Sequence, residues 1–361
     1  NNHNSDDSVK YLNSSKFLIN VHEGYLKKYV TNLVVNGEVQ KSISVIKQNR
    51  NKDNSNFFEA DLLLLIDNFK KKKFKKNIEL LNEFEKYSDY GNYEYIIYEV
   101  LKSYNDLFLL KKPSLNNDKF GQLSLINQAF QYCYLNQPEA GSVFMNIINS
   151  NQGDYSRYLF FHFNNLIKNK DFESVQQISK TINILESSLL IQQSKSWLDE
   201  SNYSKFDQIF SCYNEEDILA EFFFLIANFL SADENFTKLY FYSNISNYLN
   251  PKFYLNSTHL ISNYIQNKKY EKTKELLKNF NKEDEIYYWY KLKKIAQIID
   301  DEEGSKQSLF FIEKKFKEYS NPSIKIIYDM ANIYKRNKEF EKSIKYYSSL
   351  LKKLNENSDE Y

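Results

Sequence analysis

Residues 337–351 read NKEFEKSIKYYSSLL, and closely similar phrases occur twice earlier in the chain. Residues 267–280 read NKKYEKTKELLKNF, and residues 169–182 read NKDFESVQQISKTI. Each copy has a polar turn, an aromatic residue and then apolar residues spaced three and four apart. That spacing is typical of one face of an α-helix. The phrase therefore predicts a turn followed by an amphipathic helix, used repeatedly along the chain.

The turn-plus-aromatic phrase recurs in register over most of the 361 residues. Successive anchor positions lie 31 to 35 residues apart, which is within the range expected of a helical repeat array. Six of the ten anchors are aromatic, and three, Leu107, Glu139 and Ser305, are assigned mainly by spacing. The anchors are Val39, Phe74, Leu107, Glu139, Phe172, Tyr203, Phe236, Tyr270, Ser305 and Phe340.

Each repeat is expected to contain two helices, one on either side of the turn. In the last repeat, Ile327, Met330 and Tyr334 share a helical face before the turn, and Tyr347 and Leu350 share one after it. A short polar turn makes the two helices antiparallel, and such a hairpin buries its apolar faces only by stacking on its neighbours. The pattern predicts an all-α solenoid of about ten antiparallel helix pairs. The aromatic anchors expected to be buried in it are Phe74, Phe172, Phe236, Tyr270 and Phe340.

These repeats resemble the tetratricopeptide repeat family over residues 23–357. That family has an apolar and a small residue late in its first helix, an aromatic residue opening its second helix, and small residues within the second helix. The resemblance implies a right-handed superhelical α-solenoid. The matching residues are Met330, Ala331, Tyr334, Phe340 and Ser343 in the last repeat, and Ala227, Leu230 and Pro251 around the anchor Phe236.

Small residues recur at the contact position of the second helix, three residues after the anchor, but not in every repeat. Ser42, Ser142, Thr273 and Ser308 fit the family there. Larger residues at this position predict looser or differently angled packing of the two helices. They are Asn77, Leu110, Val175, Phe206 and Leu239.

The ends of the chain set the expected domain organisation. Residues 1–15 are polar and unpatterned and are predicted to be disordered, whereas residues 16–361 are predicted to form one continuous solenoid. The closing NSDEY, residues 357–361, falls where the next first helix should begin, and no polar capping helix precedes it. We therefore expect the array to be truncated at its C-terminal end.

Composition argues against several classes of protein. Only 7 Gly and 4 Pro occur, and no glycine-rich phosphate-binding motif is present. The net charge is +1, so no overall field attracts nucleic acid or a membrane surface. The related pentatricopeptide arrays bind RNA, but their stricter period and basic groove do not match this chain. The basic run FKKKKFKK, residues 69–76, is interpreted as a solvated turn.

Cysteine content and hydropathy bear on the compartment. Cys133 and Cys212 both fall in apolar helical windows, which predicts small buried hydrophobic residues and no disulfide framework. The longest apolar run, residues 218–232, is too short for a membrane span and predicts a buried or amphipathic helix. A cytoplasmic location is slightly favoured, and a periplasmic one is open if a signal segment was removed before Asn1.

No pattern of side chains indicates catalysis. The four histidines lie far apart without metal-binding spacing, and His162 sits within an apolar helix as a core residue would. No nucleophile motif occurs, and neither cysteine has a histidine nearby in the sequence. We expect no catalytic residues, no metal site and no cofactor, and therefore not an enzyme.

The tetratricopeptide resemblance implies a concave wall formed by the first helices, with exposed polar residues that bind an extended peptide. Side-chain amides suit this role because each offers two donors and an acceptor to a peptide backbone. Neighbouring aromatics such as Phe160, Phe224 and Tyr328 would add specificity, and two cations would favour an acidic or C-terminal carboxylate. The candidate groove residues are Gln131, Asn164, Asn228, Ser262, Lys293, Gln297, Asn332 and Arg336.

The sequence thus favours a non-catalytic scaffold that binds a peptide or a partner helix in a groove. The alternative is the helical arm of a larger enzyme or assembly whose catalytic part lies outside this chain. An RNA-binding solenoid is less favoured. The expected partner is a protein or peptide, with no nucleic acid and no membrane span.

Overall fold

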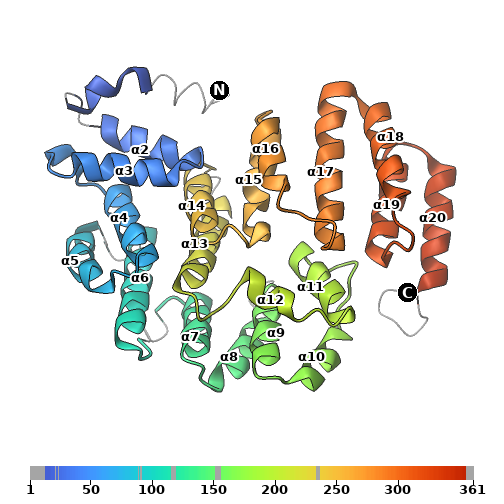
Figure 1. The fold of residues 1–361 in the computed structure, drawn as a ribbon, viewed down its shortest axis with the longest axis horizontal. Coiled ribbons are helices and arrows are strands. Elements are labelled where there is room, and N and C mark those ends of the chain that lie inside the picture. The colour runs from blue at the N-terminus through green and yellow to red at the C-terminus, as the bar shows by residue number, and fades with distance from the viewer. Residues whose placement is uncertain are drawn as a thin grey trace. The chain divides into compact units, whose positions relative to one another are not determined.

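A computed structural model describes residues 13–20, 22, 24–87, 89, 92–114, 119–150, 156–232 and 236–354. Within these residues the protein is all-α, with 19 α-helices, α2 to α20, and no strand (Figure 1). Consecutive helices pack largely in neighbouring pairs, as a helical repeat architecture requires. The predicted fold class is confirmed at this level.

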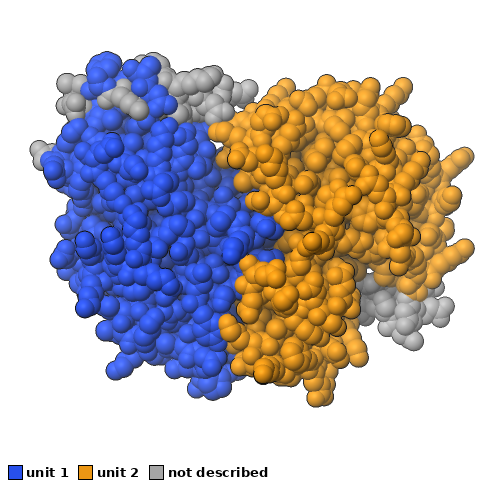
Figure 2. Space-filling view, viewed as in Figure 1, with its two compact units in different colours: residues 1–147, 209–260 blue, residues 148–208, 261–361 orange. Residues whose placement is uncertain are grey.

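The chain divides into two compact units, coloured separately in Figure 2. Unit 1 comprises residues 1–147 and 209–260, and unit 2 comprises residues 148–208 and 261–361. Each unit is therefore built from two separate stretches of chain. The prediction of one continuous solenoid over residues 16–361 stays a prediction, and most of the polar segment 1–15 and all of residues 357–361 lie outside the described residues.

Three short 3₁₀ segments lie near the first hairpins of unit 1. These segments are η1 (Lys16–Asn20), η2 (Asp53–Ser55) and η3 (Glu85–Tyr87), and η4 (Tyr254–Ser257) follows the last helix. The α-helices are α2 (Tyr25–Val35), α3 (Val39–Asn49), α4 (Phe58–Lys70), α5 (Phe74–Phe84), α6 (Tyr93–Leu110), α7 (Gln122–Tyr134), α8 (Glu139–Ile148), α13 (Glu215–Ala232) and α14 (Phe236–Leu249).

The helices of unit 2 come from the inserted stretch and from the C-terminal part of the chain. Helix α15 begins at the end of unit 1 and continues into unit 2. The helices of unit 2 are α9 (Tyr158–Lys168), α10 (Phe172–Ser179), α11 (Leu189–Asp199), α12 (Ser204–Ile209), α15 (Thr258–Gln266), α16 (Tyr270–Leu277), α17 (Glu285–Glu303), α18 (Ser305–Phe316), α19 (Ile324–Arg336) and α20 (Phe340–Lys353).

Seven of the described turns between consecutive helices share one backbone geometry. In the last turn, Lys338 has a positive φ of 63°, its N–H donates to Lys335 O, and the N–H of Glu339 donates to Tyr334 O. This is the Schellman arrangement, which satisfies the last carbonyls of a helix and stops it. The anchor predicted at Leu107 was wrong, because it lies inside the continuous helix α6, and the turn before Phe236 lies outside the described residues. The predicted turn is confirmed at six of the ten anchors, where a residue of positive φ lies two positions earlier. These residues are Gly37, Lys72, Lys170, Ser201, Lys268 and Lys338.

A second repeated contact fixes the two helices of a hairpin against each other. The hydroxyl of Ser343 in α20 donates to the carbonyl of Ala331 in α19 at 3.0 Å. Ser42 makes the equivalent bond to Val30 O, and Ser308 makes it to Ala296 O. The donor follows the acceptor by 12 residues in each case. The small residue at the contact position thus lets the helices approach and supplies a hydrogen bond between them.

The aromatic anchors are less buried than the sequence predicted. Phe172, Phe236 and Phe340 are exposed, at 40%, 55% and 59%, and Phe74 and Tyr270 are only partly buried. The prediction of burial was wrong because the anchor is the first residue of its helix, and its Cβ points back over the turn. In seven of the ten repeats the residue three positions later is buried, whereas Leu110 and Ser142 at that position are exposed and Ser308 is partly buried. The buried residues are Ser42, Asn77, Val175, Phe206, Leu239, Thr273 and Ser343.

Unit 1 is closed by helices that are distant in the sequence. Helix α14 packs on α2 and α3, and α13 packs on α4. Asn244 Nδ2 donates to Val35 O at 3.1 Å, and the Tyr248 hydroxyl donates to Gln40 Oε1 at 2.6 Å. A stacked array in which each repeat touches only its neighbours would lack these contacts. The second stretch of unit 1 therefore completes a core that the first stretch begins.

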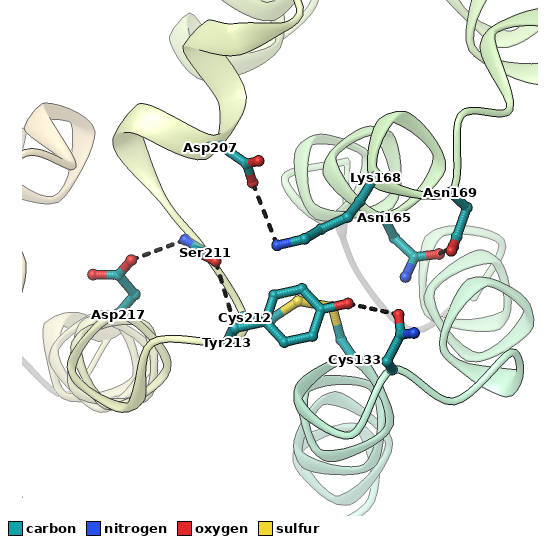
Figure 3. Close-up of a disulfide and its surroundings, with 10 residues drawn as sticks. Cys133, Asn165, Lys168, Asn169, Asp207, Ser211, Cys212, Tyr213 and Asp217 are labelled. Carbon is teal, nitrogen blue, oxygen red and sulfur yellow. Dashed lines mark hydrogen bonds and ion pairs between the residues drawn. A yellow bond between two sulfur atoms is a disulfide. The ribbon is translucent and has the colours of Figure 1, made fainter. Parts of the chain in front are cut away.

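A disulfide joins the two stretches of unit 1 (Figure 3). Cys133 in α7 is bonded to Cys212, which precedes α13, across a sequence separation of 79 residues. Both residues are buried as predicted, but the prediction that no disulfide is present was wrong. The hydroxyl of Tyr213, the residue after Cys212, donates to Asn136 Oδ1 at 2.6 Å. The pairing depends on the chain returning to unit 1, which local sequence patterns do not reveal.

A comparable long-range contact is found in unit 2. Helix α11 packs on α17, where Trp197 Nε1 donates to Asp284 Oδ1 at 2.8 Å. Lys205 forms an ion pair with the same carboxylate at 3.0 Å. From α17 onward the helices follow a simpler order, with α18 on α17, α19 on α17 and α20 on α19. This C-terminal part is the most regular stretch of paired helices in the chain.

The long apolar run of residues 218–232 lies within α13, and most of its side chains are buried, as expected. Among the helices that the structure describes, none is both long and apolar enough to span a membrane.

Candidate functional site

A cavity of about 510 Å³ opens among α17, α18 and α19 of unit 2. Its walls come from one face of each helix, because lining residues on α17 and α19 are spaced three and four apart. The floor is largely apolar, and the rim carries polar and charged groups. The lining residues are Tyr290, Lys293, Lys294, Ala296, Gln297, Asp300, Ser305, Ser308, Leu309, Ile312, Ile333, Arg336 and Asn337.

The cavity has an excess of positive charge. Three of its lining residues are cations, Lys293, Lys294 and Arg336, and one, Asp300, is a carboxylate. The Asp300 carboxylate already accepts a hydrogen bond from the Ser305 hydroxyl at 2.6 Å. Arg336 is exposed and makes no hydrogen bond or ion pair with any residue that the structure describes. Its guanidinium is therefore available to a carboxylate, which it can hold through two parallel hydrogen bonds.

Lys293 is held in place by a carboxylate on α19. Its Nζ lies 2.5 Å from Asp329 Oδ2, and Lys325 pairs with the other oxygen of Asp329 at 3.1 Å. Trp289 Nε1 also donates to Asp329, at 3.1 Å. One negative charge is thus shared by two lysines, so the neighbourhood remains positive. The ion pair also ties α17 to α19 beneath the cavity.

Lys294 is a partly buried cation of the site. Burial lowers the pKa of its ammonium group, and repulsion from the adjacent Lys293 lowers this pKa further. Its Nζ reaches Gln297 Oε1 at 3.3 Å and lies over the ring of Tyr290. An anion in the cavity would favour the charged form of Lys294. The arrangement therefore suits an anionic group held against an apolar floor.

Three of the eight candidate groove residues meet in this cavity. Lys293 and Gln297 lie on one face of α17, and Arg336 lies at the end of α19. Asn332, also on α19, is half-buried and engaged elsewhere. It donates to Tyr328 O at 3.0 Å and accepts from the Tyr347 hydroxyl at 2.8 Å.

The remaining candidates lie apart from this cavity. In unit 1, Gln131 is fully buried and bonds to Ser103 Oγ and to both backbone groups of Ser114. Asn228 is half-buried, and its Oδ1 lies 2.6 Å from His259 Nε2. In unit 2, Asn164 is buried in α9, whereas Ser262 is exposed on α15. A buried amide such as that of Gln131 supports the fold and is out of reach of a partner in this conformation.

The three aromatic residues predicted to add specificity differ in their exposure to solvent. Phe160 and Phe224 are buried in their own units, so their prediction as peptide-contacting residues was wrong. They sit on helix faces that pack within the core, and the four-residue spacing alone could not distinguish that face from an open one. Tyr328 is partly exposed, and its ring contacts that of Tyr347.

Sequence reasoning missed Lys294 and Asp329. Lys294 is part of the run KLKK, residues 291–294, and its position one turn before Gln297 was a usable signal. Asp329 gave no such signal, because its role depends on α19 packing against α17. The basic run 69–76 spans the end of α4, the predicted turn at residues 71–73 and the start of α5. Three of its lysines are paired with carboxylates of unit 1, Lys70 with Glu216, Lys71 with Asp67 and Lys72 with Glu215.

Comparison with known proteins adds no assignment. No family model matches the chain, and no curated protein or solved structure shows significant similarity to it. The class that the fold defines is an all-α protein of paired helices.

Proposed function

We propose that this chain is a non-catalytic scaffold that binds the acidic end of a partner peptide in the cavity of α17, α18 and α19. The observation that carries the proposal is the meeting of Lys293, Gln297 and Arg336 at one cavity, together with the partly buried Lys294. The apolar floor would hold an aliphatic side chain, and the cations would hold a terminal or side-chain carboxylate.

The proposal includes the finer assignment of the fold. The repeated Schellman turns and the recurring serine bonds between paired helices support a tetratricopeptide-like repeat. In that reading the hairpins form a right-handed solenoid, and the cavity is part of its concave wall. The pair α17 and α18 and the pair α19 and α20 would be its two most regular repeats.

The experiment is a fluorescence anisotropy titration with labelled octapeptides of random sequence that end in an acidic residue and a free carboxylate. We expect the tightest binders to lose about tenfold or more in affinity in Arg336→Glu, because a charge-assisted hydrogen bond becomes a repulsion. The matched control is Lys335→Glu, since Lys335 is exposed in the same helical turn but does not line the cavity. Equal loss in both variants, or no selective binding of acidic peptides, would contradict the proposal.

A further inference from the structure

Helix α20 has a second apolar face that the described chain does not cover. Phe340, Ile344 and Leu351 are 59%, 64% and 53% exposed, with the partly exposed Tyr347 between them. At 3.6 residues per turn these four side chains form one stripe along the helix. A neighbouring face, with Ser343, Leu350 and the following Leu354, is buried on the α19 side. These exposed apolar side chains are contiguous, whereas those on a monomer surface are usually scattered singly.

Charged residues follow one edge of this stripe in an ordered way. Glu341 lies near the start of the helix, and Lys345 and Lys352 lie further along the same edge, with Ser348 between them. None of these three charged groups forms an ion pair or hydrogen bond with a residue that the structure describes. By contrast, Lys342 is paired with Glu313 and Glu339. The unpaired edge is therefore negative at one end and positive at the other.

We propose that α20 is a self-association surface that pairs antiparallel with α20 of a second copy of this chain. A twofold axis near the middle of the helix would place Phe340 against Leu351 of the second copy, and Ile344 against Tyr347 of the second copy. The same operation brings Glu341 beside Lys352 of the second copy, twice per dimer. In a parallel pairing the charged edges of the two copies would lie on opposite sides of the interface, so these pairs would not form. The twofold arrangement is closed, so it ends at a dimer.

The first experiment measures the dimer dissociation constant of the full chain by sedimentation velocity. We expect concentration-dependent dimers for the wild type and a loss of at least a hundredfold in affinity for Ile344→Glu, which puts a charge inside the stripe. The matched control is Phe310→Glu, because Phe310 on α18 is 70% exposed and lies off the stripe. A wild type that stays monomeric, or dimers that Ile344→Glu leaves intact, would overturn the proposal. So would equal loss in the control.

A charge exchange tests the antiparallel direction. Glu341→Lys and Lys352→Glu alone should each weaken the dimer on the order of tenfold, since two attractive pairs become repulsive. The double variant carrying both changes should regain most of the wild-type affinity. Equal weakening of the double variant would overturn the antiparallel register.

Cross-linking provides a second measurement that does not depend on affinity. In a Glu341→Cys, Lys352→Cys double variant, the two introduced thiols are about 16 Å apart along their own helix, too far to bond to each other. Mild oxidation should therefore give a covalent dimer. Neither single variant should do so to a comparable extent. A double variant that remains uncross-linked at concentrations where the wild type is dimeric would overturn the register.

Discussion

Unit 1 and the C-terminal helices of unit 2 use similar hairpins but are completed in different ways. In unit 1 the chain returns to place α14 on α2, and the disulfide between Cys133 and Cys212 fixes that return. From α17 to α20 the helices instead add one after another, and α20 ends with an exposed apolar stripe. Long-range closure makes a segment cooperative, whereas a linear stack loses stability repeat by repeat. The comparison therefore predicts different responses of the two regions to the same perturbation.

The largest difference should come from the disulfide. Replacing both Cys133 and Cys212 with Ala should lower the free energy of unfolding of unit 1 by about 4 kcal/mol, given the 79-residue separation that the bond closes. Hydrogen exchange followed by mass spectrometry would locate the effect. We expect faster exchange in α7, α13 and α14 and little change in α19 and α20. Equally faster hydrogen exchange over the whole chain would contradict the expected difference between the two regions.

Acid should weaken unit 2 through His162. Burial lowers the pKa of this imidazole from 6.5 to about 4, so the unfolded chain binds a proton at pH 5 that the folded chain does not. Stability should therefore fall as the pH drops from 6.5 to 4, by up to about 3 kcal/mol. Denaturant unfolding monitored across this range should show a slope that His162→Gln removes. If the free energy of unfolding of the variant still falls with pH in this range, other groups cause the dependence.

Asp217 in unit 1 should act in the opposite direction. Burial raises the pKa of its carboxyl group from 3.8 to about 6, although its Oδ2 accepts the backbone N–H of Ser211 (Figure 3). The folded chain keeps this proton between pH 4 and 6 while the unfolded chain releases it. The contribution of Asp217 to stability therefore decreases as the pH rises through this range, by up to about 3 kcal/mol. Asp217→Asn should flatten this part of the profile, measured by the same unfolding experiment, and an unchanged profile would contradict the assignment.

The smallest expected effect concerns the turns that both regions share. Lys338→Gly should stabilise unit 2 by up to about 1 kcal/mol, because glycine adopts the positive φ of 63° without a steric cost. Lys72→Gly in unit 1 should gain less, since Lys72 also pairs with Glu215 at 3.0 Å. Thermal unfolding of the two variants would compare these gains. A larger gain at residue 72 than at residue 338 would contradict this account of the turns.

Much of the helical register was predictable from the sequence because it is encoded locally. A polar turn with lysine, serine or glycine two residues before six of the ten anchors marks where one helix stops and the next begins. The closure of unit 1 was not predictable in this way. Asn244 bonds to Val35 O, and Cys133 bonds to Cys212, only because segments distant in the sequence meet.

The candidate site was predictable in part for the same reason. Lys293 and Gln297 are one helical turn apart, and Arg336 follows in the next repeat, so their common side could be inferred from spacing. The burial of Gln131 and the ion pair of Lys293 with Asp329 depend on neighbouring helices. Helix periodicity identifies a face but not what packs against it.

The central proposal is that the cavity of α17, α18 and α19 recognises a carboxylate, and calorimetric titration tests it most directly. The tightest acidic octapeptide would be compared with the same peptide carrying a C-terminal amide, in wild type and in Arg336→Glu. We predict that amidation weakens binding to the wild type about tenfold or more and has little further effect in Arg336→Glu. Equal affinity of the two peptides for the wild type would contradict recognition of the terminal carboxylate, and undiminished binding by Arg336→Glu would contradict the cavity as its site.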